Sequence, residues 1–274
     1  MKLAYYIKKP RLMGDARVEA LLERFRGAGH SLYSVGGTSD FLPDTDLLLS
    51  LGGDGTFLSA ASLAVPAGVP VLGVNFGRLG FLSESDPEAV LEALSQGDYS
   101  VEERELLQVR CDALAGGEPL PFALNEMSVS RVSASMLGVD VEVDGAALPT
   151  YWADGLLVAT SSGSTAYSLS VGGPICLPET KVFIVAPISP HNLNVRPLIV
   201  PESSLLRISL RSRDERAVLT VDNRNYTIPA GARIEVSAAP VRLKRLRPGH
   251  SNFINALRSR LLWGEDVRNG GDQE

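Results

Sequence analysis

The chain has 274 residues, which is enough for one large domain or for two smaller ones that each bury a core. Hydrophobic residues make up 45% of it and charged residues 21%, which excludes an intrinsically disordered chain. The formal net charge of −6 argues against general binding to nucleic-acid backbones or anionic membranes, although it leaves room for one local basic pocket.

The beginning of the chain and its cysteines indicate a cytoplasmic protein. Lysines interrupt the first ten residues, which therefore predict a strand and not a signal peptide. No apolar run approaches the roughly 18 residues that a membrane span requires. Cys111 and Cys176 lie outside any metal-ligand spacing, and we expect two buried free thiols, with a disulfide as the alternative.

Strands alternate with helices up to about residue 98. The apolar pattern predicts strands at 3–7, 47–51 and 70–74 and helices at 18–25, 57–64 and 87–94. The range 47–51 is a nearly continuous apolar run, interrupted only by Ser50, as expected for a strand buried on both faces of a parallel sheet. Residues 1–98 therefore predict an α/β N-terminal domain that is doubly wound and Rossmann-like.

Short strands dominate from residue 99 onward. They are expected at 107–111, 127–131, 139–143, 155–159, 181–185 and 205–210, separated by Gly, Pro, Asn or Asp turns. Residues 99–250 therefore predict a mostly β C-terminal domain. Apolar residues at helical spacing predict a closing helix within 251–264, and its return to the first domain is left open. Residues 265–274 are expected to form a polar tail.

A glycine-rich bend, Gly52-Gly53-Asp54-Gly55-Thr56, links the apolar strand to a helix. Glycines let a backbone approach a ligand closely, and the N–H groups that begin a helix suit phosphate. The bend is neither a P-loop nor a dinucleotide fingerprint. Two interpretations stay open from geometry: a tight turn in which Asp54 or Thr56 caps the helix, and a ligand-binding bend whose carboxylate reaches a substrate hydroxyl.

These five residues resemble the GGDGT motif shared by NAD kinases, diacylglycerol and sphingosine kinases and, more loosely, phosphofructokinases. In that group the Asp orients or deprotonates the hydroxyl that accepts the phosphoryl group. The resemblance implies that Asp54 is catalytic and that Asp54 and Gly55 contact the substrate. It also implies a phosphate loop formed by Gly52, Gly53, Gly55 and Thr56. The motif indicates a hydroxyl kinase without specifying the acceptor.

Two further stretches specify the acceptor. Asn125 and Glu126 offer donors and acceptors that suit vicinal ribose hydroxyls, with a surface turn as the alternative. They are similar to the NE motif of NAD kinases, which contacts the NAD riboses. Residues 154–174, rich in Ser, Thr and Gly, closely resemble the NAD kinase signature D-G-x-x-x-x-T-P-T-G-S-T-A-Y-S-L-S-x-G-G-P. This resemblance implies that Asp154 reaches the nicotinamide end and that the adenosine pocket is lined by Thr165, Ala166, Tyr167, Ser168 and Ser170.

Other segments extend the resemblance over roughly residues 3 to 264. The segments 73–82, 190–197 and 257–264 are similar to the family's G-x-N-x-G-x-L-G-F-L, P-H-S-L…R-P and L-R-x-K-L-x-W elements. Two departures stand out. Ser161 and Ser162 replace the usual Pro and Thr, and Asp222-Asn223-Arg224 stands where D-G-Q is commoner, so no site residue is assigned there.

The resemblance implies an NAD kinase that transfers the terminal phosphoryl group of ATP to the 2′-hydroxyl of the adenosine ribose of NAD, giving NADP. We expect Mg²⁺ or another divalent cation to bind with ATP and not in a protein cage, so no metal ligand is assigned. The resemblance also implies a homodimer or homotetramer, and it leaves polyphosphate open as the donor. The alternatives are a lipid kinase, which would share GGDGT, and a non-catalytic dinucleotide sensor.

Overall fold

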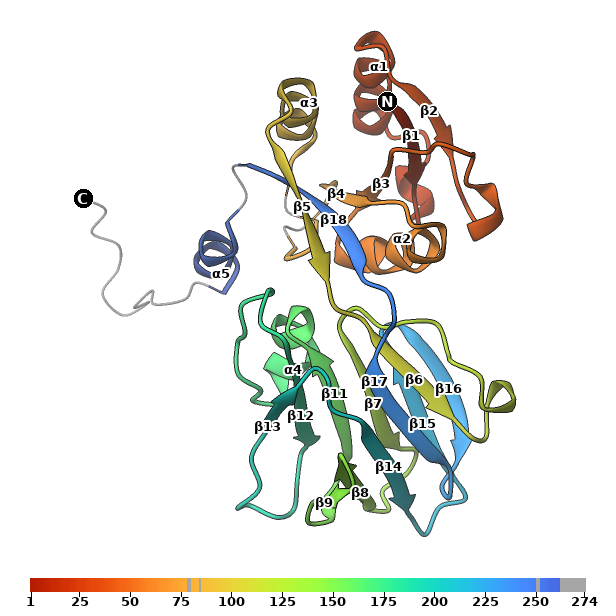
Figure 1. Cartoon of the computed structure of the whole chain (residues 1–274), viewed down its shortest axis with the longest axis vertical. Coiled ribbons are helices and arrows are strands. Elements are labelled where there is room, and N and C mark those ends of the chain that lie inside the picture. Colours follow the sequence, from red (N-terminus) through yellow and green to blue (C-terminus); the bar gives the residue numbers. More distant parts are fainter. Residues whose placement is uncertain (78–79, 84, 250–251, 262–274) are drawn as a thin grey trace, which may run out of the picture. The chain divides into compact units, whose positions relative to one another are not determined.

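The computed structural model describes residues 1–77, 80–83, 85–249 and 252–261 and divides the chain into two compact units. Unit 1 comprises Met1–Glu102 and the segment that begins at Arg245, whereas unit 2 comprises Glu103–Lys244 (Figure 1). The sequence places the domain boundaries after residues 98 and 250. The structure divides the chain elsewhere because two strands inside the range 99–250, one at each end of it, belong to the sheet of unit 1.

Unit 1 is built on a six-stranded sheet with the order β2-β1-β3-β4-β18-β5. The strands are β1 (Lys2–Tyr6), β2 (Ser31–Ser34), β3 (Leu47–Gly52), β4 (Val71–Asn75), β5 (Tyr99–Arg104) and β18 (Leu243–Pro248). Strands β1 to β4 pair in parallel, with Leu3 opposite Leu47 and Leu48 opposite Val71. Every residue of β3 is buried, so its apolar run occupies the centre of the sheet.

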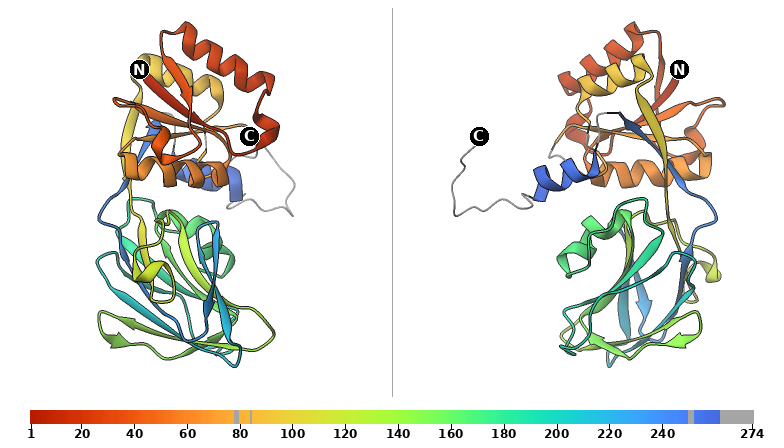
Figure 2. Two further views of the ribbon diagram at one scale, coloured as in Figure 1. Left: turned by 90° about the vertical axis from the view of Figure 1, so that its right-hand side faces the viewer. Right: turned by 60° about the vertical axis from the view of Figure 1, so that its left-hand side comes forward.

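Helices cover both faces of this sheet, which confirms the predicted doubly wound α/β domain (Figures 1 and 2). Helices α1 (Ala16–Gly27) and α3 (Pro87–Gln96) share a core with Leu47 and Leu49. Helix α2 (Asp54–Ala67) packs on the opposite face, where Phe57 lies against Gly73. The helix α5 (Phe253–Leu261) contacts this unit through Phe253, whose ring centroid lies 6.0 Å from that of Phe81. No helix in the described ranges has the length and apolarity to span a bilayer.

Unit 2 consists of two sheets of mostly antiparallel strands, as predicted. One has the order β10-β8-β14-β17-β6 with β9 beside β8, and the other has the order β13-β12-β11-β7-β15-β16 (Figure 2). The first contains β6 (Leu107–Cys111), β8 (Leu137–Val143), β9 (Ala146–Ala147), β10 (Tyr151–Ala153), β14 (Leu206–Arg211) and β17 (Arg233–Ala238). The second contains β7 (Glu126–Arg131), β11 (Gly155–Thr160), β12 (Val182–Ile188), β13 (Leu198–Pro201), β15 (Arg216–Val221) and β16 (Arg224–Pro229). Apolar side chains from both sheets form one shared core.

Short helical turns cross the outer face of the second sheet. The stretch after β11 folds into a 3₁₀ turn, η4 (Ser162–Thr165), and a single α-helical turn, α4 (Tyr167–Ser170). Hydrophobic periodicity did not predict these turns because small polar residues form them. Cys176 packs on this face with Leu157 and Ile184, and Cys111 lies in the core between the sheets. Both cysteines are buried and free, as expected.

Candidate active site

The glycine bend lies at the carboxyl end of β3, and helix α2 begins within it. Gly53 occupies the N-cap position in an extended conformation without any side-chain cap bond, and Asp54 is the first helical residue. A Cβ atom on Gly52 would lie 2.4 Å from Thr56 Oγ1, closer than any real Cβ contact. The first turn of the helix therefore folds back onto the strand end, and only glycine fits there.

The Asp54 carboxylate is held by the backbone of a second motif. Its Oδ2 accepts a hydrogen bond from Phe81 N at 2.8 Å, and its Oδ1 accepts from Leu82 N at 3.0 Å and from Ser83 N at 2.9 Å. A Cβ atom on Gly80 would lie 1.9 Å from Oδ1, so the loop can wrap around the carboxylate only with glycine at this position. The structure thus differs from the capping interpretation, in which the side chain of Asp54 would bond its own helix.

This arrangement leaves Asp54 able to accept one more hydrogen bond. An ionised carboxylate has about four lone-pair sites on its two oxygens. Three backbone donors occupy two sites on Oδ1 and one on Oδ2. Among the described residues no donor occupies the second lone pair of Oδ2, which can accept from a substrate hydroxyl, and Asp54 also lines a cavity beside the bend.

This cavity has a volume of about 590 Å³. The residues around it come from the glycine bend and from the segment after β1, which contributes Lys8, Lys9 and Arg11. Sequence analysis did not identify these three cations, because it used the lysines only to exclude a signal peptide. The signal that could have predicted their place at the cavity is that all three follow β1, a strand that neighbours β3.

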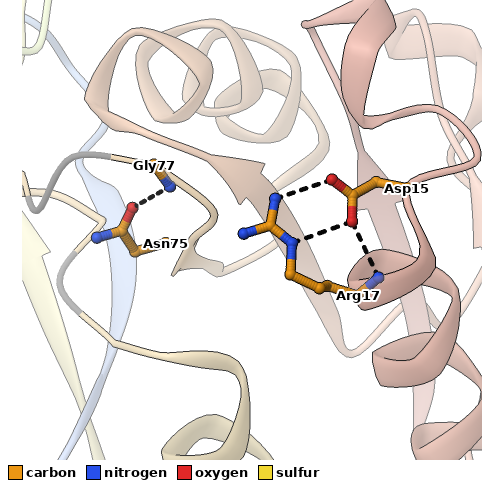
Figure 3. A network of polar contacts seen from close by, with 4 residues as sticks. All are labelled: Asp15, Arg17, Asn75 and Gly77. Carbon is orange, nitrogen blue, oxygen red and sulfur yellow. Dashed lines mark hydrogen bonds and ion pairs between the residues drawn. The ribbon is translucent and has the colours of Figure 1, made fainter.

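Two further short-range contacts shape unit 1. Asn75 Oδ1 accepts a hydrogen bond from Gly77 N at 2.8 Å, which closes the turn after β4. On another element, Arg17 forms a two-pronged ion pair with Asp15, and Nη2 lies 2.8 Å from Oδ2 (Figure 3). The hydrogen bonds and charge of Arg17 lower the pKa of Asp15 to about 2.

In unit 2, the backbone around Asn125 and Glu126 is fixed by a third carboxylate. Asp222 lies in the turn between β15 and β16 with a left-handed φ of 49°. It accepts hydrogen bonds from Leu124 N at 2.9 Å, from Asn125 N at 2.9 Å and from Glu126 N at 3.3 Å. In return, Asp222 N donates to Glu126 O at 2.9 Å. The segment that sequence analysis left without a site residue therefore positions the predicted ribose-binding pair.

Glu126 lies at the start of β7 in an electrostatically unfavourable position for a charge. Burial, and then the nearby negative charge of Asp222, raise the pKa of Glu126 from 4.5 to about 8, although the backbone N–H of Tyr167 opposes the shift. Its Oε2 is buried without a hydrogen-bond partner among the described residues. At neutral pH this carboxyl group carries a proton and can donate to a ligand oxygen as well as accept from a hydroxyl.

The Ser- and Gly-rich stretch is locked onto the Asn125 segment. Thr160 Oγ1 donates to Leu124 O at 2.6 Å, and Thr160 N donates to Asn125 O at 2.9 Å. A Cβ atom on Gly163 would lie 2.1 Å from Asn125 O, so the glycine of this signature permits the close approach. The structure therefore brings together the two motifs that were assigned to the ribose and to the adenosine.

The five residues assigned to the adenosine pocket differ in exposure. Tyr167 and Ser170 are exposed, and Thr165 and Ala166 are partly buried. Ser168 is fully buried, and a Cβ atom on Gly173 would lie 2.2 Å from its Oγ. The exposed side chains can contact a ligand directly, whereas Ser168 faces its own chain.

Asp154 lies apart from Asn125 and Glu126. It precedes β11, whose other end pairs with Glu126 through Ala159. Ala159 lies five positions after Asp154 along the strand, which spans about 17 Å at ~3.4 Å per residue. Arg131 Nε donates to Asp154 Oδ1 at 2.7 Å, so this carboxylate already has a cationic partner.

The residues that the structure describes contain no group of three or more His, Cys, Asp or Glu side chains that could hold a metal ion. Asp54 is the acidic residue that lines the cavity at the glycine bend, and backbone donors engage both of its oxygens.

Comparison with known proteins gives consistent matches over both units. Residues 36–99 match the model of the ATP-NAD kinase N-terminal domain, and residues 124–247 match that of the ATP-NAD kinase C-terminal domain. The chain is 41% identical over 229 residues to an NAD kinase of Bacteroides fragilis (strain YCH46), an alignment that covers 82% of this chain and 79% of that protein.

Two solved structures share the fold. The crystal structure of yeast NADH kinase complexed with NADH has a TM-score of 0.84 and 27% identity, covering 98% of this chain and 89% of that one. An NAD kinase from Archaeoglobus fulgidus in complex with ATP has a TM-score of 0.76 and 27% identity, covering 93% of this chain and 96% of that one. These matches agree with the resemblance drawn from the sequence motifs.

Proposed function

The chain belongs to the NAD kinase family, and from this premise we propose that it phosphorylates the 2′-hydroxyl of the adenosine ribose of NAD, giving NADP. The phosphoryl donor is ATP, in line with the family description and with the structural relative that was crystallised with ATP. The lipid-kinase alternative receives no support from these matches, which cover both units of the chain.

The observation that carries the proposal is the state of Asp54. Three backbone N–H groups fix its carboxylate at the wall of the cavity, and one lone pair of Oδ2 remains available. A fixed acceptor costs no reorganisation when the reaction begins. We assign Asp54 as the group that orients the 2′-hydroxyl and accepts its proton.

The reaction balances with these groups alone. The 2′-oxygen forms a bond to the γ-phosphorus as the bond from that phosphorus to the β,γ-bridging oxygen breaks, and the electron pair leaves with ADP. The hydroxyl proton passes to Asp54 and is later released to solvent. Such transfers proceed through a loose transition state, so the protein contributes mainly positioning and neutralisation of charge.

The acceptor-binding role falls to unit 2. We assign Asn125 and Glu126 to the ribose hydroxyls, because Asp222 fixes their backbone and Glu126 has an unpartnered oxygen. We assign the adenosine to the adjoining wall, where Tyr167 is 42% exposed. The same wall is proposed to contact the adenosine also through Thr165, Ala166, Ser168 and Ser170. We assign Asp154 to the nicotinamide end of NAD.

A divalent cation, Mg²⁺ in the first instance, is proposed to accompany ATP. Mg²⁺ usually binds through substrate phosphates, one or two carboxylates and several waters. At the glycine bend the N–H groups that begin α2 suit phosphate, so the phosphates of ATP would take most of the place of protein ligands around the cation. Bound with ATP, the cation would neutralise phosphate charge, while Asp54 and the bend would position the reactants.

The assignment extends to the cell and to the assembly. We propose that the protein acts in the cytoplasm, in NADP biosynthesis, and that it forms a homodimer or homotetramer. Size-exclusion chromatography with light scattering tests the assembly: a molar mass of two or four times 29.3 kDa is expected, and a monomer at micromolar concentration would refute it.

A coupled assay tests the activity itself. The purified protein is incubated with ATP, MgCl₂ and NAD, and NADP is read out with an NADP-specific dehydrogenase. We expect NADP formation that depends on all three additions. Tight NAD binding by calorimetry without any NADP formation would instead identify a dinucleotide sensor.

A further inference from the structure

Three cationic side chains face the glycine bend across the cavity of unit 1. Lys8, Lys9 and Arg11 follow β1, which lies next to β3 in the sheet. They are carried on an anchored turn, because Pro10 begins a 3₁₀ turn, η1 (Pro10–Leu12), whose Leu12 is buried. A protein with a net charge of −6 thus concentrates positive charge at one cavity.

Lys8 is the most closely positioned of the three. Its Nζ lies 2.9 Å from Ser59 Oγ and 3.5 Å from Gly55 O, both in the first two turns of α2. The ammonium group is therefore fixed beside the N-terminus of the helix, where unpaired N–H groups also favour an anion.

The charges of these three residues are not neutralised within the described chain. None of Lys8, Lys9 and Arg11 makes an ion pair in the described ranges, whereas Arg17, on the neighbouring helix, is paired with Asp15 (Figure 3). All three side chains are exposed to solvent, and a cleft lined by charges of one sign attracts ligands of the opposite sign.

Thr56 supplies an independent sign of a ligand. It lines the same cavity and is 1% exposed, yet its Oγ1 has no hydrogen-bond partner among the described residues. Buried hydroxyl groups are nearly always hydrogen-bonded. A phosphate oxygen in the cavity would provide the missing partner.

We propose that Lys8, Lys9 and Arg11 bind the phosphate chain of the phosphoryl donor, with the terminal phosphate beside Lys8 and the N-terminus of α2. This inference rests on the proposed function and adds three residues to its donor site. Lys8 neutralises charge on the transferred phosphoryl group, and Lys9 and Arg11 bind the phosphates that leave. A linear phosphate chain is what this site recognises, whether it belongs to a nucleoside triphosphate or to inorganic polyphosphate.

Direct binding tests the inference without relying on turnover. Isothermal titration calorimetry of the full-length protein is carried out with two probes, ATP and inorganic tripolyphosphate. We expect Lys8→Met to weaken both about tenfold, and Lys9→Met or Arg11→Met to weaken both about three- to fivefold, as for single charge contacts near a screened surface. The triple variant is expected to lose most of the salt dependence of binding.

Lys2→Met is the matched control. It removes the same charge from the opposite end of β1, where Lys2 Nζ donates to Pro43 O, and it should leave both affinities unchanged. Circular dichroism and thermal melting establish that each variant is folded. Equal affinities in the wild type and the triple variant, or no binding of either probe to the wild type, would overturn the proposal.

The two probes also separate the possible donors. Equal binding of ATP and tripolyphosphate indicates recognition of the chain alone, and stronger binding of ATP indicates an added contact to the nucleoside; both results support the site if the variants weaken them. Failure of the proposed function looks different: the wild type would bind the probes in a Lys8-dependent manner and form no NADP in the coupled assay.

Discussion

Asp54 in unit 1 and Asp222 in unit 2 make the same kind of contact in opposite roles. Each carboxylate accepts hydrogen bonds from three successive backbone N–H groups of a distant segment, 81–83 for Asp54 and 124–126 for Asp222. Asp54 lines a cavity, so the backbone serves to fix the carboxylate. Asp222 is partly buried, and burial raises its pKa although the three N–H groups oppose the shift. There the carboxylate serves to fix the backbone.

The difference shows which atoms of each cluster are available for chemistry. At Asp54 the available atom is Oδ2 of the carboxylate itself, which keeps a lone pair. At Asp222 the available atoms belong to the residues that it holds, Asn125 and Glu126. The first cluster therefore predicts an effect on the chemical step, and the second predicts an effect on substrate binding.

The largest expected effect is that of Asp54→Asn. The amide can orient a hydroxyl but cannot accept its proton, so kcat should fall by about 10²- to 10⁴-fold while NAD binds nearly as before. Steady-state kinetics in the coupled assay give kcat, and calorimetry gives the NAD affinity.

Asp40→Asn is the control for that change. Asp40 also accepts backbone N–H bonds, from Gly36 and Gly37 at 2.7 and 2.8 Å, but it lies outside the cavity lining. Its kcat should match that of the wild type. Turnover of Asp54→Asn within a few fold of the wild type would disprove the role of Asp54.

Gly80→Ala should have the next largest effect. The new Cβ atom would lie 1.9 Å from Asp54 Oδ1, so either the loop or the carboxylate must move. Displacement by about 1 Å commonly costs up to about a hundredfold in rate, so we expect kcat to fall roughly 10- to 100-fold. In Gly27→Ala, at the end of α1 and outside the cavity lining, the Cβ would meet nothing within 4 Å, and this control should retain its rate. Equal rates in the two variants would show that the loop does not position Asp54.

The sequence predicts much of the fold and the position of Asp54. The contacts that it does not predict, those that hold Asp54 and Asn125 in place, share one cause. The alternation of elements and the position of the GGDGT motif at the end of an apolar strand both follow from local patterns. The partners of Asp54 are backbone N–H groups 27 to 29 positions away, which no side-chain pattern encodes. Their only signal was that both glycine motifs follow neighbouring strands, β3 and β4.

Asp222 was missed for the same reason. Its segment departs from the family's D-G-Q pattern, so it received no role, yet the aspartate that makes all three contacts is retained. Its partners lie 96 to 98 positions away in the chain and are again backbone groups. Side-chain identity predicts chemistry at a site more readily than it predicts what holds the site in place.

Asp222→Asn tests the positioning role and should act on NAD binding. An amide has only one acceptor oxygen. Its NH₂ group would face at least one of the three backbone N–H donors of 124–126, so this segment should loosen. We expect KM for NAD to rise about tenfold with a smaller change in kcat. Loss of the negative charge should also lower the pKa of Glu126, so any limb of the pH profile of kcat/KM that reports Glu126 should move to lower pH.

Asp144→Asn is the matched control for that variant. Asp144 also has a left-handed φ, 52°, in a turn between strands, and its Oδ1 accepts from Leu205 N at 2.8 Å. It should leave KM and the pH profile unchanged. A fall in kcat with unchanged KM and pH profile in Asp222→Asn would contradict the positioning role.

The smallest expected effect is on stability, and it concerns Glu126. In the folded protein this group keeps its proton up to about pH 8, whereas its ordinary value is 4.5. The folded state therefore binds more protons between these values, and stability falls as pH rises through this window. Gln cannot ionise, so Glu126→Gln should be more stable than the wild type at pH 8.5, by on the order of 1–3 kcal/mol, and should match it near pH 4.5.

Urea unfolding of both proteins at the two pH values measures this difference. Glu105, whose pKa is also raised to about 8, mainly by burial, adds the same pH dependence to both proteins and cancels in the comparison. The amide has one acceptor oxygen and one NH₂ donor, as a protonated carboxyl group has an acceptor and a donor, so the same variant should bind NAD about as tightly as the wild type near neutral pH. A residue that destabilises its own fold while it serves a ligand is expected at a binding site. An equal stability difference at both pH values would show that Glu126 is not held in its neutral form.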